Sequence, residues 1–200
     1  MAWSLPVSEP MNTRPFLATA EDPAVRVLVL TGTGRAFSAG ADLRPSKSTG
    51  EPRSSNAPAL ADRLYQALDI EKPIIAAING YALGGGLEMA LCCDIRIASE
   101  TSRLVTAFRN VGLGGDYGMN YLLPRFVGPG RARELLFRGE NLSVERAMEL
   151  GIVNQVIPNE NFEQEALQYC AELAAGPTKA IGRMKRNLIF AETASLLSLI

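Results

Sequence analysis

The sequence predicts a single α/β domain over residues 1–200, in which buried strands alternate with helices. Three observations support this fold class. The first half contains apolar runs rich in β-branched residues, of which residues 25–31 are followed by glycine and residues 74–78 by an Asn-Gly turn. The second half carries apolar residues at helical spacing behind good capping residues. The 200 residues are 47% hydrophobic and 20% charged, which is typical of a globular chain with one sizeable core.

Strands are predicted where a short apolar run meets a turn signal. These runs are residues 25–31, 74–78, 95–98, 103–106 and 153–157. Gly32 and Gly34 follow the first run and are interpreted as residues that turn the chain. A dinucleotide-binding motif is disfavoured there, because Phe37 stands in place of its third glycine. A P-loop is disfavoured as well, because its Walker lysine is absent.

Residues 1–23 are expected to form an atypical, proline-containing lead without a strand, and residues 43–58 a flexible surface loop rich in serine, proline and charge. Helices are predicted over 59–71, 87–92 and 178–190, and in the segments that begin at Ser143 and Asn161. Ser143 is a good N-cap with Gly151 closing its helix, and Asn161 with Gln164 has the pattern of a capping box.

Two of these helices have a predicted inward face. In the helix after Asn161 it comprises Phe162, Ala166, Cys170 and Leu173. In the helix over 178–190 it comprises Ile181, Met184 and Leu188. The basic residues of that last helix are expected on its exposed face. They are Lys179, Arg183, Lys185 and Arg186.

The chain has no histidine, which excludes Ser-His-Asp and Cys-His nucleophilic systems as well as zinc sites built on imidazole. Its net charge of −1 disfavours nucleic-acid binding. Cys92, Cys93 and Cys170 lack metal-ligand spacing, so we expect free thiols in a reducing compartment and no metal. The longest apolar stretch, residues 73–93, is broken by glycines and Glu88, which argues against a membrane span. A cytoplasmic location is expected, with the mitochondrial matrix as the alternative.

Two glycine-containing segments are candidates for a binding site. In residues 37–43, small residues such as Ala39 would let a ligand approach the backbone closely. In residues 79–94, three glycines precede a helix that carries Glu88, so backbone N–H groups and the helix dipole would favour an anion. Close packing of the helix on a sheet is the alternative explanation of the glycines. For Glu88, the alternative explanation is that an acidic residue in the first turn simply stabilises the helix dipole.

Taken together, residues 37–43 and 72–99, with residues 112–128 and 131–157, resemble the enoyl-CoA hydratase/isomerase, or crotonase, superfamily. The resemblance covers residues 24–192 and implies a spiral of ββα units with a shortened C-terminal helical region over 178–200. It implies an acyl-CoA thioester as substrate, with no separate cofactor. It also implies an oxyanion hole made by two backbone amides, which fall at Ala41 and Gly85. Further substrate-binding positions implied by the match are Ala39, Asp42, Leu43, Gly84, Phe108 and Tyr117.

The resemblance also suggests which groups move protons. Hydratases of the family use two glutamates; one matches Glu88, but Phe108 occupies the place of the other. Asp116 falls where isomerase-like members and some dehalogenases carry a catalytic aspartate, although an aspartate beside glycine is also common in turns. Asp116 and Glu88 are therefore the expected catalytic residues, for double-bond isomerisation or hydration of an enoyl-CoA.

Both ends of the chain differ from the family pattern. Members begin with a strand hairpin and end in helices that build a homotrimer or hexamer. This chain is expected to lack the strand hairpin and most of the C-terminal helices. The alternative function is therefore a non-catalytic acyl-CoA-binding or assembly subunit. Exposed apolar surface is expected where these elements are missing.

Overall fold

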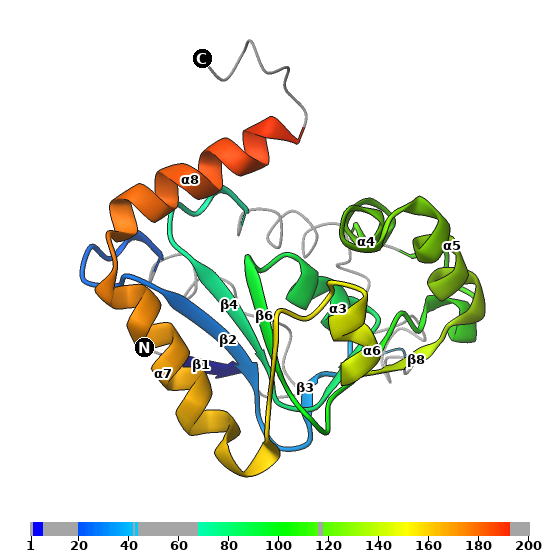
Figure 1. The fold of residues 1–200 in the computed structure, drawn as a ribbon. Coiled ribbons are helices and arrows are strands. Elements are labelled where there is room, and N and C mark those ends of the chain that lie inside the picture. The colour runs from blue at the N-terminus through cyan, green and yellow to red at the C-terminus, as the bar shows by residue number, and fades with distance from the viewer. Residues whose placement is uncertain (1, 6–19, 42, 44–67, 116–117, 193–200) are drawn as a thin grey trace, which may run out of the picture.

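The computed structural model describes residues 2–5, 20–41, 43, 68–115 and 118–192. It contains two β-sheets with helices packed around them (Figure 1). The larger sheet has five parallel strands in the order β1-β2-β4-β6-β9. The bounds of these strands are β1 Ala2–Leu5, β2 Leu28–Gly32, β4 Ile74–Ile78, β6 Ile95–Ser99 and β9 Gln155–Ile157. A parallel strand is covered on both faces, which explains why β4 is a continuous apolar run and is buried along its whole length.

The smaller sheet has four strands in the order β3-β5-β7-β8, of which only the β7–β8 pair is antiparallel. Its strands are β3 Ala36–Ser38, β5 Tyr81–Leu83, β7 Arg103–Val105 and β8 Asn141–Ser143. Three of them directly follow a strand of the larger sheet, so the chain crosses from one sheet to the other at β2–β3, β4–β5 and β6–β7. The second crossing leads into helix α3 (Gly85–Leu91).

The first two crossings are joined to each other at their turns. The side chain of Asn79 accepts a hydrogen bond from the Gly32 N–H and donates one to the Gly34 carbonyl, both at 3.0 Å. Gly34 has a φ of +74°, which few other residues adopt. A Cβ at Gly80 would lie 2.3 Å from the carbonyl oxygen of Arg35. Gly32 and Gly34 therefore turn the chain, as predicted, and their bonds to Asn79 join the turn after β2 to the turn after β4.

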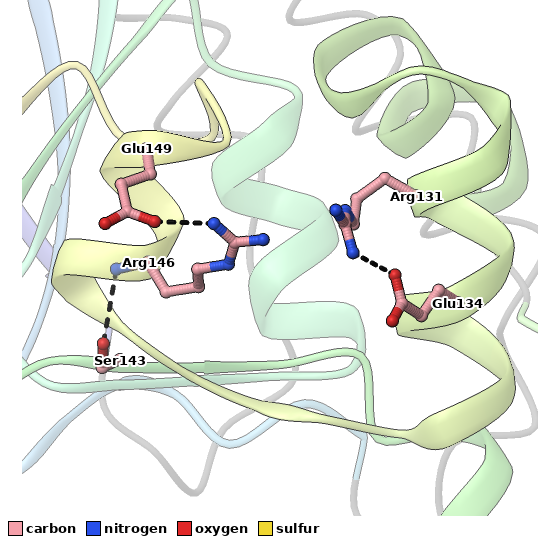
Figure 2. A network of polar contacts seen from close by, with 5 residues as sticks. All are labelled: Arg131, Glu134, Ser143, Arg146 and Glu149. Carbon is pink, nitrogen blue, oxygen red and sulfur yellow. Dashed lines mark hydrogen bonds and ion pairs between the residues drawn. The ribbon is translucent and has the colours of Figure 1, made fainter.

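The remaining helical elements come mostly from the second half of the chain. They are η1 Phe108–Val111, α4 Met119–Val127, α5 Pro129–Arg138, α6 Val144–Glu149, η2 Asn159–Asn161, α7 Phe162–Ala175 and α8 Thr178–Ala191. Ser143 is the predicted N-cap of α6: its hydroxyl accepts a hydrogen bond from the Arg146 N–H at 3.3 Å (Figure 2). Arg146 also pairs with Glu149 at 2.6 Å, one turn along the exposed surface.

The predicted capping box at Asn161 is wrong. The Asn161 side chain makes no capping hydrogen bond; instead the short helix η2 runs directly into α7, with the Asn161 N–H donating to Pro158 at 3.1 Å. The predicted inward face of α7 is confirmed at Phe162, Ala166 and Cys170, which are buried, while Leu173 is half-buried.

The core lies on both sides of the larger sheet. Ile74, Ala76 and Ile78 of β4 belong to a cluster shared with α3, α4, α5 and α6, whereas Ile75 and Ala77 belong to a second cluster beneath α7. This alternation follows from the two-residue repeat of a strand. Of the candidate site residues that the structure describes, Phe108 belongs to the first cluster, and Glu88 stands between two of its members, Leu87 and Met89, on α3.

Two predicted segments in the N-terminal half differ from the structure. The lead predicted to lack a strand contains β1, which pairs in parallel with β2 and forms an edge of the larger sheet. The strand predicted over 25–31 begins later, at Leu28. Two further predictions lie largely outside the described residues: the helix over 59–71, of which Leu68 and Asp69 are described and are helical, and the flexible loop over 43–58.

The inward face predicted for α8 is wrong at Met184 and Leu188, whereas Ile181 is half-buried. Met184 and Leu188 are 60% and 70% exposed, and Lys185, expected on the solvent side, is only 7% exposed. Its ammonium group lies 2.9 Å from Asp94 Oδ2, which also accepts the Ile74 N–H at 2.8 Å. A Cβ at Gly182 would lie 2.1 Å from the carbonyl oxygen of Glu71. Close backbone packing and an ion pair, rather than the apolar stripe, therefore orient this helix.

Lys185→Ala is expected to lower the free energy of unfolding by about 3 kcal/mol, because it removes the buried ammonium group that pairs with the half-buried Asp94. The matched control is Arg186→Ala, whose partner Glu71 is exposed, and its effect should stay below about 1 kcal/mol. Urea unfolding followed by circular dichroism measures both. Equal losses in the two variants would show that the Lys185 ion pair does not hold α8.

Candidate active site

The two glycine-containing segments singled out in the sequence lie against each other. β3 and β5 are parallel neighbours, so the chain leaves both at the same edge of the smaller sheet. Gly40 follows β3 with a φ of +80°. A Cβ at Gly40 would lie 2.7 Å from the carbonyl oxygen of Leu83 and 3.4 Å from the nitrogen of Gly85. The backbone around Gly40 therefore touches the backbone that opens α3.

The three consecutive glycines before Leu87 have different surroundings. At Gly86 a Cβ would lie 2.3 Å from the carbonyl oxygen of Ser38, so this glycine allows α3 to pack closely on β3. Gly84 is buried, has a φ of +51° and donates its N–H to Val105 at 2.8 Å. A Cβ at Gly85 would have no heavy atom within 4 Å. The close-packing explanation thus accounts for Gly86, while Gly85 faces open space.

The predicted amide donors occupy the two segments that Gly40 brings into contact. Gly85 is the first residue of α3, where an N–H group has no partner within the helix. Ala41 is exposed, and so are Ala39 before it and Leu43 beyond it, which is 46% exposed. Asp42 lies outside the described residues. Backbone donors beside open space are the kind of group that can stabilise an oxyanion.

Glu88 lies in the first turn of α3 and its side chain is fully buried. Its N–H donates to the Gly84 carbonyl at 3.1 Å, which ties the carboxylate-bearing residue to the glycine segment. Burial and, to a smaller extent, the negative charge of Glu88 raise the pKa of Cys92, one turn along the helix, to about 12. The predicted catalytic carboxylate is therefore buried, on the first turn of the helix that begins at the glycine segment.

Phe108 lies in a tight turn that contacts Gly84. The turn begins at Ala107, a non-glycine residue with a φ of +58°, and Ala107 Cβ is 3.6 Å from where a Gly84 Cβ would stand. Phe108 is 7% exposed; its N–H donates to Thr106 at 2.7 Å and its carbonyl accepts the Leu113 N–H at 2.9 Å. A left-handed alanine costs about 1–2 kcal/mol and is typical of functional sites. The position where hydratases of the family carry their second glutamate thus holds a buried aromatic ring.

Asp116 and Tyr117 lie outside the described residues, but the chain on both sides of them is described. Gly115 before them and Gly118 after them have φ values of +85° and +105°. The side-chain amide of Asn120 donates to the carbonyl oxygens of Gly114 and Gly115, at 3.0 and 3.1 Å. Sequence reasoning missed Asn120, since an asparagine near a glycine-rich loop carries no distinctive pattern. It also missed Ser38, whose backbone lies against Gly86.

The three cysteines are free, as predicted, and all three are buried. Burial raises the pKa of Cys92 to about 12 and that of Cys170 to about 11, and it also raises the pKa of Cys93. We expect the native protein to resist Ellman's reagent at pH 8 and to react at all three cysteines after unfolding in urea. Rapid labelling of the native protein, at the rate of a free cysteine, would contradict this burial.

The same pKa shifts give a pH dependence of stability. Unfolded thiols lose their protons near pH 8.5, whereas Cys92 and Cys170 keep theirs in the folded chain up to about pH 12 and 11. The unfolded state therefore binds fewer protons in this window, and the thiols' contribution to stability is lost as the pH rises above about 9.

Among the described residues, no group of three or more His, Cys, Asp or Glu side chains is arranged to hold a metal ion. No helix within the described part of the chain is long and apolar enough to cross a membrane.

Comparison with known proteins gives a consistent picture. The family model described as enoyl-CoA hydratase/isomerase matches residues 12–197. The chain is 38% identical over 180 residues to 1,2-epoxyphenylacetyl-CoA isomerase of Escherichia coli (strain K12), covering 88% of this chain and 69% of that protein. It is 37% identical over 150 residues to crotonyl-CoA hydratase of Syntrophomonas wolfei, covering 74% of this chain and 58% of the relative. The chain thus spans about three fifths of the length of several curated relatives that it matches.

A solved structure of enoyl-CoA hydratase from Bacillus anthracis superposes with a TM-score of 0.84 at 31% identity, covering 94% of this chain and 73% of that one. This likeness confirms the predicted fold class.

Proposed function

This chain belongs to the enoyl-CoA hydratase/isomerase family, or crotonase superfamily, and we propose that it processes acyl-CoA thioesters by stabilising a thioester enolate between the backbone amides of Ala41 and Gly85. One observation carries the proposal: the backbone at Gly40 lies against Leu83 and Gly85, so the two segments that bear these amides are in contact. Gly85 also faces open space, where a thioester oxygen has room to approach.

The chemistry suits donors of this kind. When a proton leaves the carbon next to a thioester, negative charge develops on the thioester oxygen. Preorganised N–H donors stabilise that charge, and each is worth about 3–4 kcal/mol of the barrier. Such donors need no titratable side chain, which agrees with a chain that contains no histidine.

Double-bond isomerisation is the reaction that these residues support best. Asp116 would remove the α-proton of a β,γ-enoyl thioester, and the electron pair would pass onto the thioester oxygen. The proton would then return at the γ-carbon, leaving the double bond between the α- and β-carbons, with no other reactant consumed. Glu88 would act as a second acid/base or orient the acyl chain. Hydration is less favoured, because the buried ring of Phe108 cannot hold or activate water.

A non-catalytic acyl-CoA-binding role is the second candidate, and the replacement of the second family glutamate by Phe108 favours it. A β,γ-enoyl-CoA and the matching α,β-enoyl-CoA, each incubated with the full chain, separate the candidates. Conversion of the β,γ-enoyl-CoA to the α,β-enoyl-CoA, with no hydration of the α,β-enoyl-CoA, supports the proposed isomerisation. Calorimetric binding without turnover favours the second candidate, and absence of both binding and turnover contradicts both.

A further inference from the structure

One hydroxyl group holds the backbone at the point where the chain leaves the smaller sheet toward Ala41. Ser38 is the last residue of β3, and its Oγ accepts a hydrogen bond from the N–H of Gly40 at 3.3 Å. A serine hydroxyl that bonds the backbone two residues further on stabilises a turn and ends the regular strand. The bond therefore restrains the residue that directly precedes Ala41.

The backbone of Ser38 is itself held from two sides. Between Ala36 and Ser38 the register with β5 shifts, so that two steps along β3 match one step along β5, as in a β-bulge. Phe37, which lies at this shift, is buried in the first core cluster. On the other side, the carbonyl oxygen and Cβ of Ser38 lie 2.3 and 2.7 Å from where a Gly86 Cβ would stand. Ser38 is thus a fixed point between β5 and α3, from which its hydroxyl reaches Gly40.

The direction of the Ala41 N–H depends on Gly40. This N–H belongs to the planar peptide unit that starts at the Cα of Gly40, so the position and the two backbone dihedrals of Gly40 decide where it points. Gly40 has a φ of +80°, one of several backbone conformations that a glycine adopts with similar ease. The hydrogen bond to Ser38 restricts that choice, because it holds the N–H of the same residue.

We propose that Ser38 is a positioning residue: by accepting the Gly40 N–H, its hydroxyl keeps the Ala41 amide pointing at the thioester oxygen. The inference rests on the proposed function, in which the Ala41 and Gly85 amides stabilise the charge on that oxygen. A donor lowers the barrier only where it points at the developing charge. A displacement of about 1 Å at a reacting group can cost about 100-fold in rate.

The first test is Ser38→Ala in the full chain, assayed for turnover of a β,γ-enoyl-CoA. Alanine keeps the Cβ that packs on Gly86 and removes only the hydrogen-bond acceptor. Because Ser38 is half-buried, the change opens no large cavity, and unfolding curves verify that the variant folds. We expect kcat to fall about 10- to 100-fold with KM changed by less than about threefold, since a misdirected donor weakens the transition state more than substrate binding.

The matched control is Ser143→Ala. Ser143 also ends a strand of the smaller sheet, and its hydroxyl accepts the Arg146 N–H at the same 3.3 Å (Figure 2). This variant therefore loses a hydrogen bond of the same kind and length at another place in the fold. Its kcat should stay within about twofold of the wild type. A folded Ser38→Ala variant with wild-type kcat, or an equal loss in both variants, would overturn the inference.

Infrared spectroscopy adds a readout that needs no turnover. Butyryl-CoA, isotope-labelled at its thioester carbonyl, has no double bond to move, and N–H donors that polarise the carbonyl lower its stretching frequency. We expect such a shift on binding to the wild type and to Ser143→Ala, and loss of at least about half of it in Ser38→Ala. An equal shift in Ser38→Ala would overturn the inference and leave the proposed function standing. Absence of the shift in the wild-type complex would contradict the proposed function, and the inference with it.

Discussion

Asp116→Asn is expected to lower kcat for enoyl-CoA isomerisation by about 1,000-fold, with KM changed by less than about threefold. Asparagine keeps the shape of the side chain but cannot accept the α-proton, so the loss falls on the chemical step and not on binding. Steady-state turnover of a β,γ-enoyl-CoA gives kcat, and exchange of its α-proton with deuterated water reports the proton-transfer step directly.

The control for this prediction is Asp69→Asn, which makes the same chemical change at an exposed residue away from the glycine segments. Its kcat should stay within about twofold of the wild type. If Asp116→Asn also retained the wild-type rate, proton transfer would have to be assigned to another group, and Glu88 in the first turn of α3 would be the first to examine.

Gly40→Ala is expected to lower kcat by about 100- to 1,000-fold, the cost of losing one oxyanion donor. The added methyl group would meet the Leu83 carbonyl oxygen at 2.7 Å, and alanine disfavours a φ of +80°. The segment must therefore move, and the Ala41 amide moves with it. Turnover at saturating substrate measures the effect, and circular dichroism with urea unfolding shows whether the variant is folded.

Gly130→Ala is the matched control for this change. Gly130 lies in α5, where a Cβ has no heavy atom within 4 Å and the backbone is helical. The rate should be unchanged and the stability should rise by up to about 1 kcal/mol, since alanine is the better helix former. A folded Gly40→Ala variant with wild-type kcat would show that the contact between the two segments does not serve the reaction.

The sequence predicts those parts of this molecule that depend on local periodicity. The apolar run of residues 74–78 predicts a strand, and the structure confirms it as β4 with the same bounds. Site prediction was less complete, because neighbours in sequence can have different neighbours in space. The sequence does not distinguish Gly84, Gly85 and Gly86 from one another. In the structure, Gly84 donates its N–H to Val105, Gly85 faces open space and Gly86 packs on Ser38.

The errors arise where distant segments decide the outcome. The apolar stripe of α8 predicts an inward face at Met184 and Leu188, but the helix is oriented by Lys185 and Gly182, which meet Asp94 and Glu71. Helical periodicity contains no information about those partners. Similarly, β1 has no strong local signal and exists as a strand through its pairing with β2.

The alternation along β4 has a mechanical consequence. Because Ile74, Ala76 and Ile78 serve one core while Ile75 and Ala77 serve the other, loss of this strand would remove contacts from both layers at once. We therefore expect the amides of β4 to be among the slowest of the described residues to exchange with solvent. The open space at Gly85 thus borders the part of the molecule that is expected to unfold last.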